Sequence, residues 1–84
     1  MIINVRHLDY LVAAAENGSF RRAAEALHVR QSSVSRAIRQ LEDDLGVSLF
    51  ERRATGAQLT DAGRRLLREV RPALEQLGLA RKAA

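Results

Sequence analysis

Residues 31–45 read QSSVSRAIRQLEDDL, and this stretch decides the fold. On a helix that turns by about 100° per residue, it places four apolar side chains in one narrow stripe: Val34, Ile38, Leu41 and Leu45. The stripe predicts a helix over residues 31–45 that buries one face in a core. Gly46 follows directly and is the kind of residue at which a helix ends.

The opposite face of this helix carries short polar and positively charged side chains near its N-terminal end. Such side chains, together with the free N–H groups of a helix N-terminus, are what a helix needs to contact base edges and phosphates in the major groove of DNA. The acidic residues 42–44 lie at the other end, where phosphates would repel them, so the N-terminal half would enter the groove. The candidate base- and groove-contacting residues are Gln31, Ser32, Ser33, Ser35, Arg36 and Arg39.

These residues also have ordinary structural interpretations. Ser32 and Ser33 could simply cap the helix, and Arg39 with Asp43 could form a surface ion pair. Arg30 is a poor N-cap residue, so we expect Ser33 to supply part of the cap.

A shorter amphipathic helix is expected just before this one. Ser19 is a good N-cap residue, and the segment that follows it places four side chains on one face: Phe20, Ala23, Ala24 and Leu27. Residues 28–30 leave room only for a turn, which produces helix-turn-helix spacing, although His28 stands where many such units have Gly. Because any helical bundle can contain two amphipathic helices with a short link, the spacing alone leaves DNA binding open.

A further helix at the N-terminus and a hairpin complete the expected domain. Asn4 is a plausible N-cap, and Asn17-Gly18 would end the first helix. Alternation over residues 47–52 predicts a short strand, Thr55-Gly56 a turn, and residues 57–59 a returning strand. Residues 47–59 would thus form a small β-hairpin, or wing.

Arginines flank the expected recognition surface. Arg52 and Arg53 lie in the wing, where they could contact backbone phosphates or a neighbouring minor groove, or form a solvated turn. The candidate backbone and wing contacts are Arg30, Arg52 and Arg53, and Arg6, Arg21 and Arg22 are weaker candidates for phosphate contacts.

A last helix begins after Thr60, its expected cap, with Asp61 favourably placed against the helix dipole. Its apolar residues recur at alternating spacings of four and three, as in a two-helix coiled coil. The helix could lie across its own domain, but a dimerisation helix is favoured, with candidate residues Leu66, Leu67, Val70, Ala73, Leu74 and Leu77. Pro72 predicts a kink near residues 68–72 or a division into two shorter helices.

Composition agrees with a polyanionic partner. The formal charge is +4, and 13 of the 14 cationic residues are Arg, whose planar fork pairs with phosphates and guanine edges. There is no Cys, and His7 and His28 are isolated from any nucleophile or carboxylate partner, so we expect no enzyme activity, metal or cofactor. No apolar run is long enough to cross a membrane, and no secretory signal is visible, which favours a cytoplasmic protein.

Eight stretches spread over nearly the whole chain carry a family resemblance: His7–Leu11, Gly18–Phe20, Ala23–Val29, Gln31–Ile38, Leu41-Glu42, Leu45–Val47, Leu49–Arg52 and Leu59–Gly63. With these stretches the sequence resembles the N-terminal DNA-binding domain of LysR-type transcriptional regulators. The resemblance implies a mainly α fold, in which a winged helix-turn-helix of three helices and a small hairpin (residues 1–59) is followed by a linker helix (residues 60–84) that pairs in a dimer.

The resemblance also implies a function. Such regulators bind operator DNA as dimers on interrupted inverted repeats, and the positions matching Gln31, Ser32, Ser33, Ser35 and Arg36 usually meet DNA. They carry a C-terminal inducer-binding domain, which is absent from this chain, so we expect a bacterial cytoplasmic fragment, associated with the nucleoid when bound, that takes no small-molecule inducer. The alternative is a helical module whose Arg-rich face binds an acidic protein partner.

Overall fold

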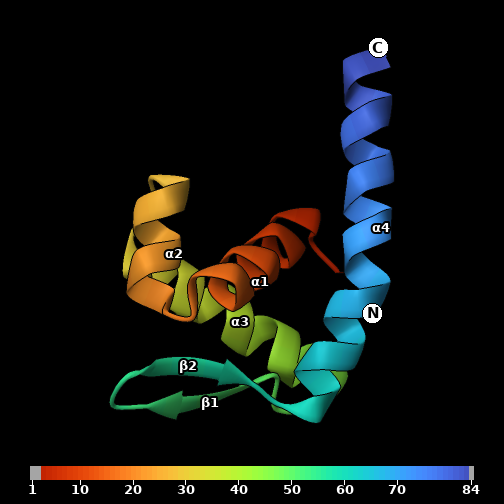
Figure 1. Cartoon of the computed structure of the whole chain (residues 1–84). Helices are drawn as coiled ribbons and strands as arrows, with labels where there is room; N and C mark the ends of the chain where they lie inside the picture. The colour runs from red at the N-terminus through yellow and green to blue at the C-terminus, as the bar shows by residue number, and fades with distance from the viewer. Residues whose placement is uncertain (1–2, 84) are drawn as a thin grey trace.

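The computed structural model describes the backbone of residues 3–83 and the side chains of residues 3–78. Four helices and a two-stranded antiparallel sheet follow one another along the chain (Figure 1). The elements are α1 (Val5–Asn17), α2 (Phe20–Leu27), α3 (Gln31–Leu45), β1 (Phe50–Arg53), β2 (Gly56–Leu59) and α4 (Asp61–Ala83). The mainly α winged helix-turn-helix fold is confirmed.

The predicted caps set the ends of the first two helices. The side chain of Asn4 accepts a hydrogen bond from the Arg6 N–H at 2.9 Å, and Ser19 Oγ accepts one from the Arg22 N–H at 3.2 Å. Gly18 ends α1 in the left-handed conformation, at φ 64°. His28 ends α2 in the same conformation, at φ 57°, although L-residues with a Cβ disfavour it.

The core lies where α1, α2 and α3 meet the root of the wing. The largest fully buried side chains are Leu11, Val34, Ile38, Leu41 and Leu49. Phe20 from α2 and Phe50 from β1 pack edge to face, with their ring centroids 5.3 Å apart. The apolar stripe predicted for residues 31–45 therefore faces this core, and the opposite side of α3 is left to solvent.

The first strand of the wing, β1, is shorter than the alternation of residues 47–52 predicted. Its strands pair from Phe50 with Leu59 to Arg53 with Gly56, so residues 47–49 form a loop and not a strand. The reason is Glu42, whose Oε2 accepts hydrogen bonds from the Leu49 N–H at 2.8 Å and the Phe50 N–H at 3.3 Å. These contacts turn the chain inward, and Leu49 and Phe50 are both buried.

The start of α3 also differs from the prediction. Arg30 occupies the N-cap position, and its side chain makes no capping hydrogen bond. The expected cap from Ser33 was wrong, because Ser33 contributes only its backbone N–H, which donates to the Arg30 carbonyl at 3.0 Å. The first turn of α3 is thus left without a side-chain cap.

Helix α4 begins as predicted but is not divided at Pro72. Thr60 Oγ1 accepts a hydrogen bond from the Gly63 N–H at 3.0 Å, and the helix runs from Asp61 to Ala83 with Pro72 inside it. Of the two alternatives, the division into two shorter helices was wrong, since the loss of one backbone donor does not end the helix. A kink near residues 68–72 stays a prediction. Near its start α4 lies against the domain, where Val70 is buried, and its other end extends beyond the remaining elements (Figure 1).

Candidate nucleic-acid interface

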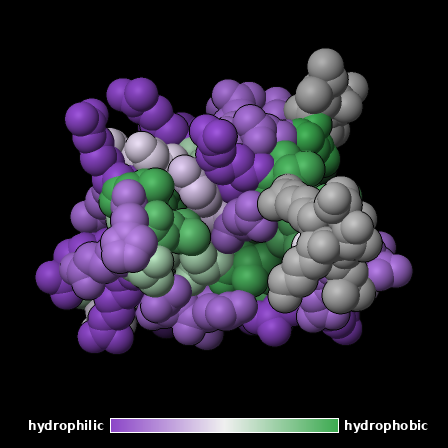
Figure 2. Space-filling view, turned by 90° about the horizontal axis from the view of Figure 1, so that it is seen from above, coloured by the Kyte–Doolittle hydropathy of each residue, from purple (hydrophilic) through white to green (hydrophobic). Residues whose placement is uncertain are grey.

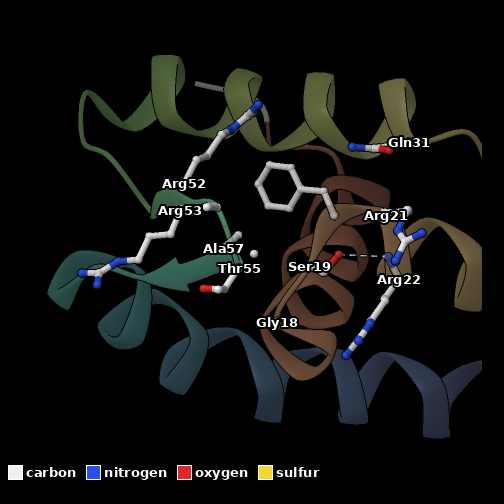
Figure 3. Close-up of a pocket in the computed structure, with 12 residues that line it drawn as sticks. Gly18, Ser19, Arg21, Arg22, Gln31, Arg52, Arg53, Thr55 and Ala57 are labelled. Carbon is white, nitrogen blue, oxygen red and sulfur yellow. Dashed lines mark hydrogen bonds between the residues drawn. The ribbon is translucent and has the colours of Figure 1, made fainter.

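A concave surface lies between the wing and the N-terminal turns of α2 and α3. Its wall is formed by the α1–α2 turn and the start of α2 on one side, by Gln31 of α3 at the top, and by both strands of the wing on the other side (Figure 3). The lining residues are Gly18, Ser19, Phe20, Arg21, Arg22, Gln31, Arg52, Arg53, Ala54, Thr55, Gly56 and Ala57.

The charge of this concave surface is positive. Four of its lining residues are arginines, two on α2 and two on β1, and none of the twelve is acidic. All four arginines are exposed. The N-terminus of α2 faces the same space and adds the positive end of a helix dipole. The surface therefore suits a negatively charged ligand, such as a phosphate.

Contacts between distant segments hold the wing in this position. The Ala57 N–H donates to the Gly18 carbonyl at 3.0 Å, which joins β2 to the α1–α2 turn. Gly56 lies next to this contact at φ 138°, and a Cβ there would stand 2.3 Å from the Gly18 carbonyl oxygen. Only glycine permits so close an approach at that conformation.

The predicted contact residues of α3 are divided between two flanks of the helix. Gln31 faces the concave surface, and Ser35 lies on the same flank, one turn later. Ser33 and Arg36 line a second groove beside the N-terminal turns of α1. Ser32 and Arg39 are exposed on the surface of α3. The six residues thus surround the exposed side of α3 and do not form a single cluster.

The predicted arginines have different surroundings. Arg52 is turned toward α3, where its Nη2 donates to Ser35 Oγ at 3.2 Å and its guanidinium lies 4.8 Å from the centre of the Phe20 ring. Arg53 points away from α3 (Figure 3) and pairs with Glu51 on its own strand at 3.0 Å. Arg30 is exposed just before α3.

Two functional features escaped the sequence reasoning. Glu42 was grouped with Asp43 and Asp44 as an acidic end of α3, yet its carboxylate holds the backbone at the root of the wing. Phe20 was assigned only to the core, yet its ring also lies beneath the Arg52 guanidinium. A glutamate at the C-terminal end of a helix has no local pattern that distinguishes a solvated side chain from a bridging one.

Metal sites and membrane-spanning helices were both considered among the described residues. Within residues 3–83 no cluster of three His, Cys, Asp or Glu side chains could hold a metal ion. Nor is any helix in that range long and apolar enough to cross a membrane.

Comparisons with known proteins agree with this geometry. Residues 5–64 match the family model described as bacterial regulatory helix-turn-helix protein, lysR family. The chain is 44% identical over 82 residues to the dual regulator OxyR of Escherichia coli, covering 98% of this chain and 27% of OxyR. It is 53% identical over 70 residues to the regulator TfdS of Cupriavidus pinatubonensis, covering 83% of this chain and 24% of TfdS.

Solved structures of related domains have the same fold. The DNA-binding domain of CbnR, crystallised with DNA, is 41% identical and superposes with a TM-score of 0.89, covering 95% of this chain and 92% of that one. The corresponding domain of BenM, in complex with benA site 1 DNA, is 32% identical with a TM-score of 0.88, over 95% of this chain and 90% of that one. The chain therefore belongs to the lysR family of bacterial regulatory helix-turn-helix proteins.

Proposed function

We propose that this chain binds double-stranded operator DNA in a sequence-specific manner, as the DNA-binding part of a bacterial transcriptional regulator. In this proposal α3 enters the major groove, and the wing (residues 47–59) contacts the backbone or the adjacent minor groove. The observation that carries the proposal is the likeness, at 41% identity, to a domain crystallised on DNA. Because the chain spans only about a quarter of the length of OxyR and TfdS, it would do so within a longer regulator.

The surface chemistry supports two separate sets of DNA-contacting residues, one for phosphates and one for bases. Arginines on both sides of the concave surface are suited to phosphates, which set register but carry no sequence information. Ser32, Arg36 and Arg39 project from the exposed side of α3, where side chains could reach base edges. The uncapped first turn of α3 leaves backbone N–H groups for a further phosphate.

Selection of bound duplexes from a random DNA pool tests the proposal directly. A preferred sequence should emerge, and Arg36→Ala should weaken binding to it by about 1–3 kcal/mol and relax the base preference. Arg68→Ala is the matched control, since it removes the same charge from an exposed position on α4. If Arg36→Ala weakens selected and random duplexes equally, Arg36 contacts only phosphate.

Failure of the selection would favour a different function. If the wild-type chain shows no preference for any duplex over random DNA, sequence-specific binding is wrong. The arginine-rich face would then be better explained by an acidic protein partner.

We also propose that the chain acts as a homodimer on an interrupted inverted repeat, joined through α4. The first half of the predicted apolar seam is covered within the chain itself, because Leu66 packs against the core and Val70 is only 6% exposed. Farther along the same stripe, Ala73 is exposed and Leu77 is 42% exposed. Figure 2 shows hydrophobic surface among hydrophilic side chains when the molecule is viewed from above. Pairing of this distal part would place two recognition helices about 34 Å apart, or a multiple of that distance.

The remaining predicted seam residues differ in exposure. Leu67 and Leu74 are half-buried, and Leu74 lines a groove between α4, α1 and the end of α2. Leu77 is therefore the most informative position, because it contributes least to the domain's own core. Leu77→Asp should shift the chain toward monomers in sedimentation velocity, whereas Gln76→Asp, an exposed neighbour, should not. Dimers that persist in Leu77→Asp would show that the interface lies elsewhere.

A further inference from the structure

Two neighbouring arginines of the wing are held in very different ways. The Arg52 guanidinium is restrained from two sides, by a hydrogen bond to Ser35 Oγ at 3.2 Å and by the face of Phe20 at 4.8 Å from the ring centre. These contacts join β1 to α3 and α2, three elements that all border the concave surface. Arg53 pairs instead with Glu51 of its own strand, and both side chains of that pair are 59% exposed.

Although Arg52 is restrained, most of its N–H donors are still available to bind a ligand. A guanidinium has five N–H donors in a planar fork, and the bond to Ser35 uses one. The Phe20 ring makes a cation–π contact with the guanidinium, whose carbon lies 4.8 Å from the ring centre. Arg52 is thus oriented while keeping donors for a bidentate contact to a phosphate, which is the geometry that an arginine recognises best.

A restrained arginine binds a phosphate at lower entropic cost than a free one. A long exposed side chain loses rotamer freedom when it binds, and that loss is smaller when the unbound protein already holds the side chain in place. Phe20 can act as a rigid support because it is itself fixed, being 7% exposed and packed edge to face on Phe50.

We propose that Ser35 and Phe20 are positioning residues for Arg52, which they hold at the inner wall of the concave surface so that it contacts a DNA phosphate. Ser35 then contributes to affinity through Arg52 and does not read a base itself. This inference rests on the proposed function and deepens it, because it divides the predicted contact residues of α3 by role. Ser35 acts through Arg52 of the wing, whereas Ser32 and Arg36 recognise bases.

A double-mutant cycle on the 84-residue chain tests this assignment. The variants are Ser35→Ala, Arg52→Gln and the pair, each titrated by fluorescence anisotropy with the duplex recovered from the random pool and with a random-sequence duplex. Ser35→Ala should raise the Kd by about two- to twelve-fold on both duplexes, the range expected for losing the restraint on one long side chain. Arg52→Gln should lower the salt slope of log Kd by about one, because one phosphate contact is lost. The double variant should bind as Arg52→Gln does.

Matched variants separate positioning from general structure. Ser35→Thr retains a hydroxyl and should restore binding, and Arg53→Gln combined with Ser35→Ala should show additive losses. Phe20→Leu removes the ring face but keeps an apolar side chain, so it should weaken binding only while Arg52 is present. Thermal unfolding of every variant shows whether a loss of binding follows from a loss of folding.

Two results would overturn the inference. One is additivity of Ser35→Ala and Arg52→Gln, and the other is a change of base preference at a single position in Ser35→Ala. Either would show that Ser35 contacts DNA independently of Arg52. Both differ from failure of the proposed function, in which the wild-type chain itself would not distinguish the selected duplex from random DNA.

Discussion

Replacing Glu42 by Ala should destabilise the domain by detaching the root of the wing from α3. The carboxylate accepts two backbone hydrogen bonds, from Leu49 at 2.8 Å and from Phe50 at 3.3 Å, in a partly buried setting. Hydrogen bonds to a charged group contribute about 1.5–3 kcal/mol each, and the better helix propensity of Ala offsets a few tenths of that. Since the longer bond is the weaker, we expect a total loss of about 2–3 kcal/mol.

Urea and thermal unfolding, followed by circular dichroism at one protein concentration, measure this loss. For a domain of this size, each kcal/mol lowers the Tm by about 4–8 °C, so Glu42→Ala should lower it by roughly 10–20 °C. Asp43→Ala is the matched control, because it removes the same charge from the next, exposed residue and should stay within about 0.5 kcal/mol of wild type. Glu42→Gln keeps one acceptor oxygen and should fall between the two. Equal stability of Glu42→Ala and Asp43→Ala would refute the assigned role of Glu42.

Two further substitutions test close contacts and backbone conformation. Gly63→Ala should lower the free energy of unfolding by about 1–3 kcal/mol, because the new Cβ would stand 2.3 Å from the Leu49 carbonyl oxygen. In contrast, Gly78→Ala meets no described atom within 4 Å and should stabilise α4, so equal urea midpoints for the two variants would contradict this reasoning. His28→Gly should raise the free energy of unfolding by about 0.5–1 kcal/mol, since glycine relieves the cost of φ 57°. His28→Ala keeps a Cβ and should bring no gain; if both variants unfold at the same midpoint, backbone strain at His28 is not the cause.

The helices could be predicted from the sequence because their determinants are local. Asn4, Ser19 and Thr60 cap the helices that follow them, and Gly18 and Gly46 adopt the left-handed conformation that ends α1 and α3. Each of these interactions spans at most four residues, so the chain segment itself carries the information. The apolar stripe of residues 31–45 likewise set which face of α3 enters the core.

The bounds of the first strand were wrong because a distant segment decided the outcome. The first strand begins at Phe50 because Glu42, eight residues earlier, takes the backbone N–H groups that alternation assigned to a strand. The dimer seam of α4 stays a prediction, but the structure separates its residues: Val70 is covered within the chain and Leu77 is exposed, because only the first part of α4 lies against the domain. Periodicity identifies an apolar face but not the partner that covers it.

The sequence by itself determined the helix-turn-helix, the wing and the arginine-rich surface, because caps, turns and periodicity act over a few residues. The tertiary structure alone decided how the arginines of that surface are held. Ser35 and Arg52 are 17 residues apart, and the two meet over Phe20 only because α2, α3 and β1 converge there. Contacts of this kind depend on how rigid elements pack in three dimensions, and a local pattern of residues cannot predict that packing.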